Sequence, residues 1–174
     1  PKDELLVSER IEGWQQQFDR NHSQEKSDDG DTAEASSVVQ RRVAVVVAGV
    51  HVDALNGMPG VLSARWSGRH GDDSANTSLL LAQIGDVPQQ RRGAAFVSAC
   101  ALVWGAGEVV VRGQWPGSIV REPRGDGGFG YDPVFLPSGS TRTAAELSAA
   151  EKDAVSHRGR ALKALLPALR ELAT

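Results

Sequence analysis

The pattern of apolar and polar positions divides the chain near residue 38, where a long polar stretch gives way to the sequence of a folded core. Residues 43–50 read VAVVVAGV, a β-branched run that predicts a strand covered on both faces. Residues 94–104 and 108–115 predict two more strands. The glycine-rich GAG turn between them is short, so we expect an antiparallel hairpin.

Helical spacing of apolar residues predicts one helix before this core and one within it. Before the polar stretch 19–37, which reads as a solvated loop or linker, a short amphipathic helix is expected from Val7, Ile11, Trp14 and Phe18. A second helix is expected over residues 74–85, capped by one of three residues, Asp72, Asp73 or Ser74. Its inward-facing residues would be Leu79, Leu80 and Ile84.

Two helices are predicted near the C-terminus. Ser148 and Glu151 have the spacing of a capping box and predict the start of a short one. The longer one runs from about residue 156 to 172, and Pro167 is expected to kink it because proline removes a helical donor. Its apolar stripe consists of Leu162, Leu165, Leu166, Leu169 and Leu172. Helices therefore interleave with strands, and the fold class is α/β or α+β, of which we expect α/β.

Composition narrows the possible functions. The 174 residues suit one domain, and the net charge of -3 with a pI near 5.8 argues against a general binder of nucleic acid polymers. The single cysteine, Cys100, lies in an apolar run and is expected to be a buried core thiol. No apolar stretch is long enough to cross a bilayer, and the N-terminus has no signal pattern, so we expect a cytoplasmic protein with no membrane partner.

The stretch GDGGFGYDPVF, residues 125–135, is the first candidate for chemistry. Glycines at this density serve either a turn that needs positive φ angles or a loop that lays its backbone and one aromatic ring against a flat ligand. Phe129 would be that ring. The stretch alone leaves both interpretations open.

A second candidate is the start of the C-terminal helix. Ser156 is a good N-cap, which puts His157 and Arg158 in the first turn, where cations oppose the helix dipole. Lys152 adds another cation nearby. An anionic or acceptor-rich ligand would relieve this conflict, and the alternative is a solvated basic helix end.

In order and spacing, GDGGFGYDPVF, TAAELS and EKDAVSHRGRAL resemble the signature of the inosine triphosphate pyrophosphatase family, and VDALNGMPGVLSARWSG, residues 52–68, is similar to another of its segments. The resemblance implies a long mixed β-sheet flanked by helices with a nucleotide cleft, in a single domain 1–174 whose family-like core is 43–174. It also implies a Mg²⁺-dependent homodimer that hydrolyses the noncanonical purine nucleotides ITP, dITP and XTP to monophosphate and pyrophosphate.

By the family's pattern, Phe129 stacks on the purine, and the rest of the loop and the basic helix start surround the nucleotide. The substrate-binding residues that the resemblance implies are Phe129, Gly130, Tyr131, Asp132, Lys152, Ser156, His157 and Arg158. The physical logic is consistent with this assignment. A 6-oxo purine presents an acceptor where adenine presents an amino donor, so a site with donors at that edge leaves them unpaired against adenine.

The N-terminal third, residues 1–42, and the strand that follows depart from the family. The Asn and Lys that hold the triphosphate are missing, and the family's acidic Asp-Asp-Ser-Gly motif is replaced by Val46, Val47, Ala48 and Gly49. Valine can neither bind Mg²⁺ nor accept a proton from water. The family's catalytic role therefore cannot be carried over to Val47.

Three explanations remain open for this departure. The chain is a paralogue that binds nucleotide without hydrolysing it, or an enzyme whose N-terminal third has been altered, for example by a frameshift, or an enzyme that uses substitute carboxylates. The candidates for the last case are Glu34, Asp53 and Asp126.

Overall fold

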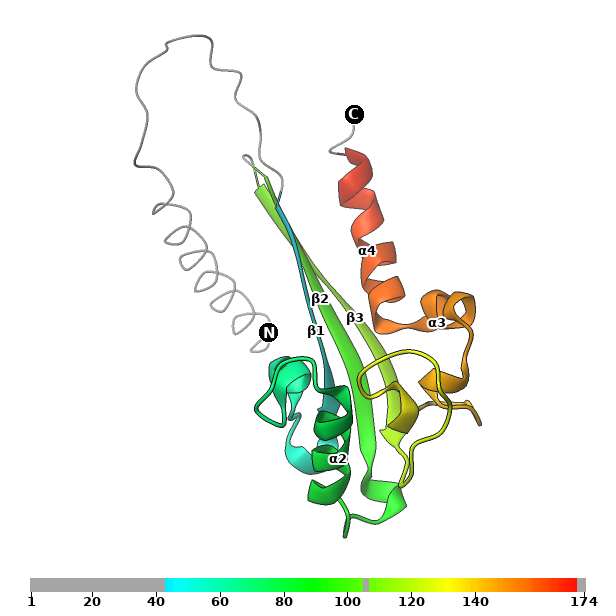
Figure 1. Ribbon diagram of the computed structural model, residues 1–174. Coiled ribbons are helices and arrows are strands. Elements are labelled where there is room, and N and C mark those ends of the chain that lie inside the picture. The colour runs from blue at the N-terminus through cyan, green and yellow to red at the C-terminus, as the bar shows by residue number, and fades with distance from the viewer. Residues whose placement is uncertain (1–42, 105–106, 172–174) are drawn as a thin grey trace, which may run out of the picture. The chain divides into compact units, whose positions relative to one another are not determined.

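The computed structural model describes residues 43–104 and 107–171 (Figure 1). Internal contacts divide the chain after Val39, and every described residue belongs to the unit 40–174. The predicted helix over residues 7–18, the polar stretch 19–37 and the candidate carboxylate Glu34 lie outside the described residues.

The described strands form one sheet in the order β1–β2–β3–β4. Their bounds are β1 Val43–Val52, β2 Gly93–Trp104, β3 Gly107–Ile119 and β4 Phe135–Pro137. All three pairings are antiparallel, and the β2–β3 register runs from Gly93 opposite Ser118 to Trp104 opposite Gly107. The predicted hairpin and the long sheet flanked by helices are confirmed. The short strand β4 was not predicted, because three residues carry no periodic signal.

Three helices are described: α2 Asp73–Gln83, α3 Ala149–Val155 and α4 His157–Glu171. Each is preceded by a residue whose side chain can cap its first turn. Asp72 accepts from the backbone N–H of Ala75, and Ser148 forms the predicted capping box with Glu151. The helix α4 continues through Pro167. Short 3₁₀ helices occur at Asp53–Leu55, Gly60–Arg65, Gln89–Arg91, Asp132–Val134 and Ala144–Glu146.

The described core has two parts. The larger part joins strand residues such as Val50 and Phe96 to Leu80 of α2 and to Ile84, the residue after it, as predicted. The third residue predicted to face inward, Leu79, is only half-buried, and Leu81 packs against this core instead. The smaller part joins Cys100 and Leu102 of β2 to α4 through Ala161 and Leu165.

The helix α4 lies along β2 and β3 (Figure 1). It approaches closely because β3 has a glycine, Gly113, where a Cβ would collide with the backbone of α4 at His157 and Ala161. Small residues therefore make this contact. Of the described leucines in the predicted stripe, only Leu165 is buried, and Leu162, Leu166 and Leu169 are exposed. The thiol of Cys100 is buried, as expected.

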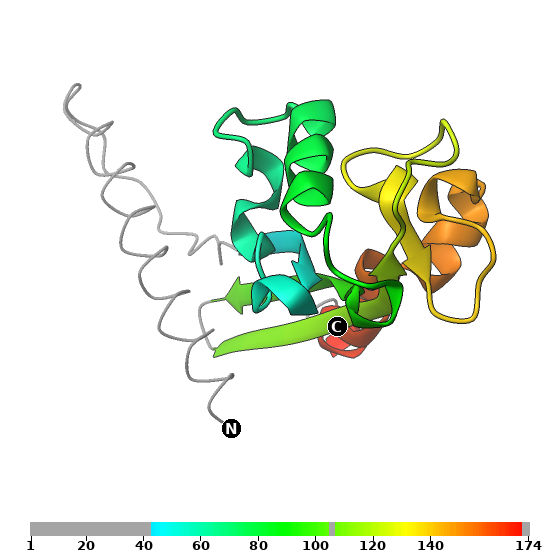
Figure 2. The same ribbon diagram turned by 90° about the horizontal axis from the view of Figure 1, so that it is seen from below.

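The part of the chain that the structure describes contains no helix with the length and apolar character that crossing a bilayer requires. In Figure 2, the long loop after β3 lies beside α2, and α3 lies on the other side of this loop. The loop carries the glycine-rich stretch, so the candidate site is formed where it meets these two helices.

Candidate functional site

The glycine-rich loop folds back tightly before Asp132. Gly125, Gly128 and Gly130 have φ angles of 83°, 74° and 60°, which other residues rarely adopt. A Cβ on Gly128 would collide with the carboxylate of Asp132. Because the backbone can approach so closely, the N–H of Phe129 donates to Asp132 Oδ2 at 2.7 Å. The turn projects the Phe129 ring outward, where its side chain is 56% exposed.

Asp132 connects this loop to α3. The Asp132 carboxylate is almost completely buried, and its Oδ2 also accepts a hydrogen bond from Lys152 Nζ, which forms an ion pair with it. A buried carboxylate requires such a partner, because an unpaired charge in the interior is strongly unfavourable. The pair therefore holds the loop and α3 together.

Two cations lie close to the Phe129 ring. Lys152 Nζ lies 4.5 Å from the centroid of the Phe129 ring, and the Arg158 guanidinium carbon lies 4.8 Å from it. Both distances are within the range of cation–π attraction. The structure thus brings together three of the sequence-predicted residues from three separate segments, with the ring and the Arg158 side chain exposed.

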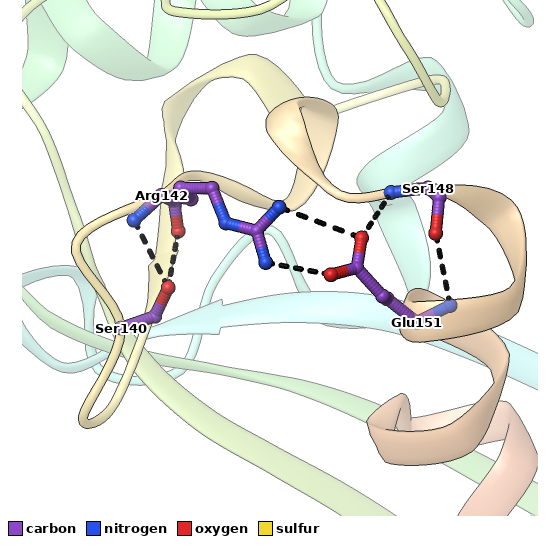
Figure 3. A network of polar contacts seen from close by, with 4 residues as sticks. All are labelled: Ser140, Arg142, Ser148 and Glu151. Atoms are coloured by element: carbon purple, nitrogen blue, oxygen red, sulfur yellow. Dashed lines mark hydrogen bonds and ion pairs between the residues drawn. The ribbon is translucent and has the colours of Figure 1, made fainter.

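Figure 3 shows how α3 is anchored at its first turn. Arg142 donates to both carboxylate oxygens of Glu151, at 2.7 and 3.4 Å, and the backbone N–H of Ser148 donates to Glu151 Oε2 at 2.8 Å. Ser140 in turn accepts from the backbone N–H of Arg142 at 3.0 Å. The hydrogen bond from Arg142, and then those from Ser148, lower the pKa of Glu151 to about 2. Lys152 is the next residue of α3, and its ammonium is held separately, by Asp132.

His157 lies in a different environment from its neighbour Arg158. The His157 side chain is 4% exposed and stacks on Phe96 with centroids 5.0 Å apart. Burial, followed by the nearby charges of Arg158 and Lys152, lowers its pKa to about 4, so the imidazole is neutral at pH 7. Its Nδ1 is buried and has no hydrogen-bond partner among the described residues.

Two further predicted residues are held by the protein itself. Ser156 Oγ accepts from the backbone N–H of Gly159 at 3.2 Å, which is the predicted capping contact. Tyr131 is buried, and its hydroxyl donates to the backbone oxygen of Ser63 at 2.9 Å. Burial, and then the charge of Asp73, raise the pKa of Tyr131. Both side chains therefore shape the site from within.

The described residues do not fit a metal centre. Within 43–104 and 107–171, no group of three or more His, Cys, Asp or Glu side chains could hold a metal ion. Val46 and Val47 of β1 are 54% and 37% exposed at the position of the family's acidic motif. Asp53 and Asp126, the two described substitute candidates, do not form such a group.

A family model for the Ham1 family matches residues 6–168. The chain belongs to this family. A dITP/XTP pyrophosphatase of Mycobacterium tuberculosis is 80% identical over 126 residues, which are 72% of this chain and 62% of the relative. Another of Corynebacterium efficiens is 61% identical over 132 residues, 72% of this chain and 64% of the relative. The chain thus spans about three fifths of the length of these curated relatives.

Solved Ham1-family structures share the fold. A nucleoside-triphosphatase / dITP/XTP pyrophosphatase of Mycobacterium abscessus is 58% identical with a TM-score of 0.66, covering 80% of this chain and 82% of that chain. A HAM1 protein of Coxiella burnetii is 38% identical with a TM-score of 0.70, covering 75% of this chain and 68% of that chain.

Sequence reasoning missed three residues that build this Ham1-family site and its support. Asp73 was considered only as a helix cap, yet Asp73 and Thr77 of α2 bond both polar groups of the Gly130 backbone. Arg92 is fully buried and bonds three backbone carbonyls. No sequence signal could have found the contacts to Gly130, because their partners are more than fifty residues apart.

Proposed function

We propose that this Ham1-family chain binds noncanonical purine nucleoside triphosphates, namely ITP, dITP and XTP, and that its activity is their hydrolysis to monophosphate and pyrophosphate. The exposed Phe129 ring with Lys152 and Arg158 beside it is the observation that carries the proposal. A purine stacks on such a ring, and cations complement a polyphosphate or a carbonyl edge. The dITP/XTP pyrophosphatase names of the relatives support the same substrate class.

Donors around Phe129 give a physical basis for base selection. Lys152 and Arg158 carry only donors, so they can pair with the 6-oxo group of hypoxanthine or xanthine. Adenine presents an amino group at that position, which would leave these donors unpaired in a partly desolvated site. We therefore expect the protein to prefer ITP over ATP.

A second candidate function is nucleotide binding without efficient hydrolysis. The exposed Val46 and Val47 favour it, because hydrolysis at the α-phosphorus needs phosphate charge to be neutralised and water to be activated. Mg²⁺ is the cofactor we propose for the family reaction, and the described residues supply no carboxylate cluster for it. The two candidates share the base site and differ only in turnover.

The test combines titration calorimetry with ITP, with and without Mg²⁺, and an assay of pyrophosphate release. We expect ITP to bind more tightly than ATP, and Phe129→Ala to weaken ITP binding by about 1–3 kcal/mol, the usual contribution of base stacking. Val110→Ala, another exposed apolar truncation but on β3, is the matched control and should bind as the parent does. Equal binding of ITP by the parent and by Phe129→Ala would show that the base does not stack on this ring.

Pyrophosphate release separates the two candidates. Strong Mg²⁺-dependent release, from protein whose intact mass matches the sequence, would establish the hydrolase and show that carboxylates other than a motif on β1 serve it. Tight ITP binding without release would establish the binding function.

Two further properties, implied by the family resemblance, are proposed for this chain. We infer a homodimer, which light scattering on the purified protein would test by its molar mass. We also infer that the protein acts in the cytoplasm, where nucleoside triphosphates are available, and cell fractionation would test this.

A further inference from the structure

The helix α2 holds the base-binding loop from the side opposite to Asp132. The backbone N–H of Gly130 donates to Asp73 Oδ2 at 2.7 Å, and the backbone oxygen of Gly130 accepts from Thr77 Oγ1 at 3.3 Å. Both residues lie in the first part of α2, one helical turn apart, so they face the loop together. Both polar groups of the Gly130 backbone are therefore bonded to this helix.

Near Gly130, no other hydrogen bond of the described residues joins the loop to α2; Arg121, at the start of the loop, bonds instead to Gly85 and Val87 beyond the end of this helix. Residues 121–129 are all exposed, and a Cβ on Gly130 would meet nothing within 4 Å. A pocket of about 340 Å³ lies between α2 and the loop, and its lining includes Asp73, Thr77 and the backbone from Gly127 to Gly130. Because Gly130 has no neighbour within 4 Å of a Cβ, its backbone is held by these two hydrogen bonds and not by side-chain packing at that position.

Two consecutive amides thus fix the direction of the Phe129 ring. The N–H of Phe129 is held by Asp132, and the N–H of the next residue, Gly130, is held by Asp73. Hydrogen bonds to an ionised carboxylate are stronger than those between neutral groups. Phe129 lies between Gly128 and Gly130, so without these bonds its backbone could adopt many other conformations. Removing one of the two anchors would let the ring leave its place beside Lys152 and Arg158, where a purine stacked on it lies within reach of both cations.

We propose that Asp73 is a positioning residue for base recognition: it acts through Gly130 to hold the Phe129 ring in place for the purine. This role rests on the proposed nucleotide binding, because it concerns the same ring. The helix α2 belongs neither to the glycine-rich loop nor to the pair of cations, yet through Asp73 it takes part in substrate selection. Thr77 contributes a weaker second contact.

The variant Asp73→Ala tests this role, and Asp72→Ala is its matched control. Asp72 caps α2 by accepting from the backbone N–H of Ala75 at 3.1 Å and, among the described residues, makes no hydrogen bond to the loop, so its loss weakens the same helix end. We expect Asp73→Ala to bind ITP about 5- to 20-fold more weakly than the parent. This is less than the roughly 10- to 150-fold value of a full hydrogen bond to a charged group, because Asp132 still holds the Phe129 amide. Asp73→Asn keeps an acceptor oxygen and should restore most of the binding. Asp72→Ala should bind ITP as the parent does while unfolding at a lower temperature.

Hydrogen exchange at the Gly130 amide tests the same role without ligand. Exchange should be faster in Asp73→Ala than in the parent and unchanged in Asp72→Ala. If the parent fails to bind ITP while this exchange pattern is found, the proposed function is wrong and the positioning of the loop stands. If Asp73→Ala matches Asp72→Ala in both ITP affinity and Gly130 exchange, the positioning role is wrong.

Discussion

Arg92 gives the sharpest test of how the described fold is held together. Its side chain is 1% exposed, and the guanidinium donates to the backbone oxygens of Ile84 at 2.6 Å, Ile119 at 2.9 Å and Val120 at 3.1 Å. Ile84 is the C-cap of α2, and the other two residues lie at the end of β3. One cation therefore ties the end of a helix to the end of a strand, where it also complements the helix dipole.

Replacement by methionine keeps the apolar stem and removes all three donors. The oxygen of Ile84 would keep a bond from the N–H of Val87 at 3.1 Å. The oxygen of Ile119 would keep one from Gln89 Nε2 at 3.3 Å. Only the backbone oxygen of Val120 would lose the one hydrogen bond that it accepts from a described residue. A buried carbonyl left without a donor costs about 1–3 kcal/mol, and each lost second hydrogen bond costs about 0.5–1.5 kcal/mol. Part of this cost is recovered, because methionine carries no charge that has to be buried. The expected net loss is about 3 kcal/mol in the free energy of unfolding.

Urea denaturation of the parent, Arg92→Met and Arg91→Met measures this difference. Arg91 is the exposed neighbour, so the same substitution there should change the free energy of unfolding by no more than about 0.5 kcal/mol. The slope of the transition should stay the same in all three proteins. A loss below about 1 kcal/mol for Arg92→Met would refute the reasoning, because it would mean that water or relaxation satisfies the three carbonyls.

The other predictions concern the site. Because burial lowers the folded-state pKa of His157 to about 4 from an ordinary value of 6.5, the unfolded chain takes up this proton first. The free energy of unfolding should therefore fall as the pH falls from 6.5 to 4, and His157→Phe should remove that part of the slope in pH-dependent melts. Arg158→Ala should reduce the ratio of ITP to ATP affinity in calorimetry, and an unchanged ratio would remove Arg158 from base selection. Val46→Asp with Val47→Asp should not restore pyrophosphate release, because the phosphate-binding lysines are also absent, and robust release from this double variant would contradict that view.

The local elements of the described chain could be predicted from sequence because each has a local physical cause. A β-branched run forms β1, and two apolar runs on either side of a glycine turn form the hairpin β2–β3. Ser148 and Glu151 start α3 where the capping box requires it. The ordered motifs around Phe129, Lys152 and Arg158 indicate the family from the sequence alone, and the structure brings these three side chains together.

What the sequence could not determine depends on contacts between distant segments. His157 and Arg158 are neighbours in one helical turn, yet one is buried against Phe96 and the other lies at the Phe129 ring. Only the packing of α4 against β3 decides between these environments. Asp73 likewise reads as one of several possible helix caps, and its bond to Gly130 arises only when α2 and the loop meet. A helix or strand is specified by its nearest residues, whereas burial, pKa and the partner of a polar group are set by whichever segment the fold places beside them.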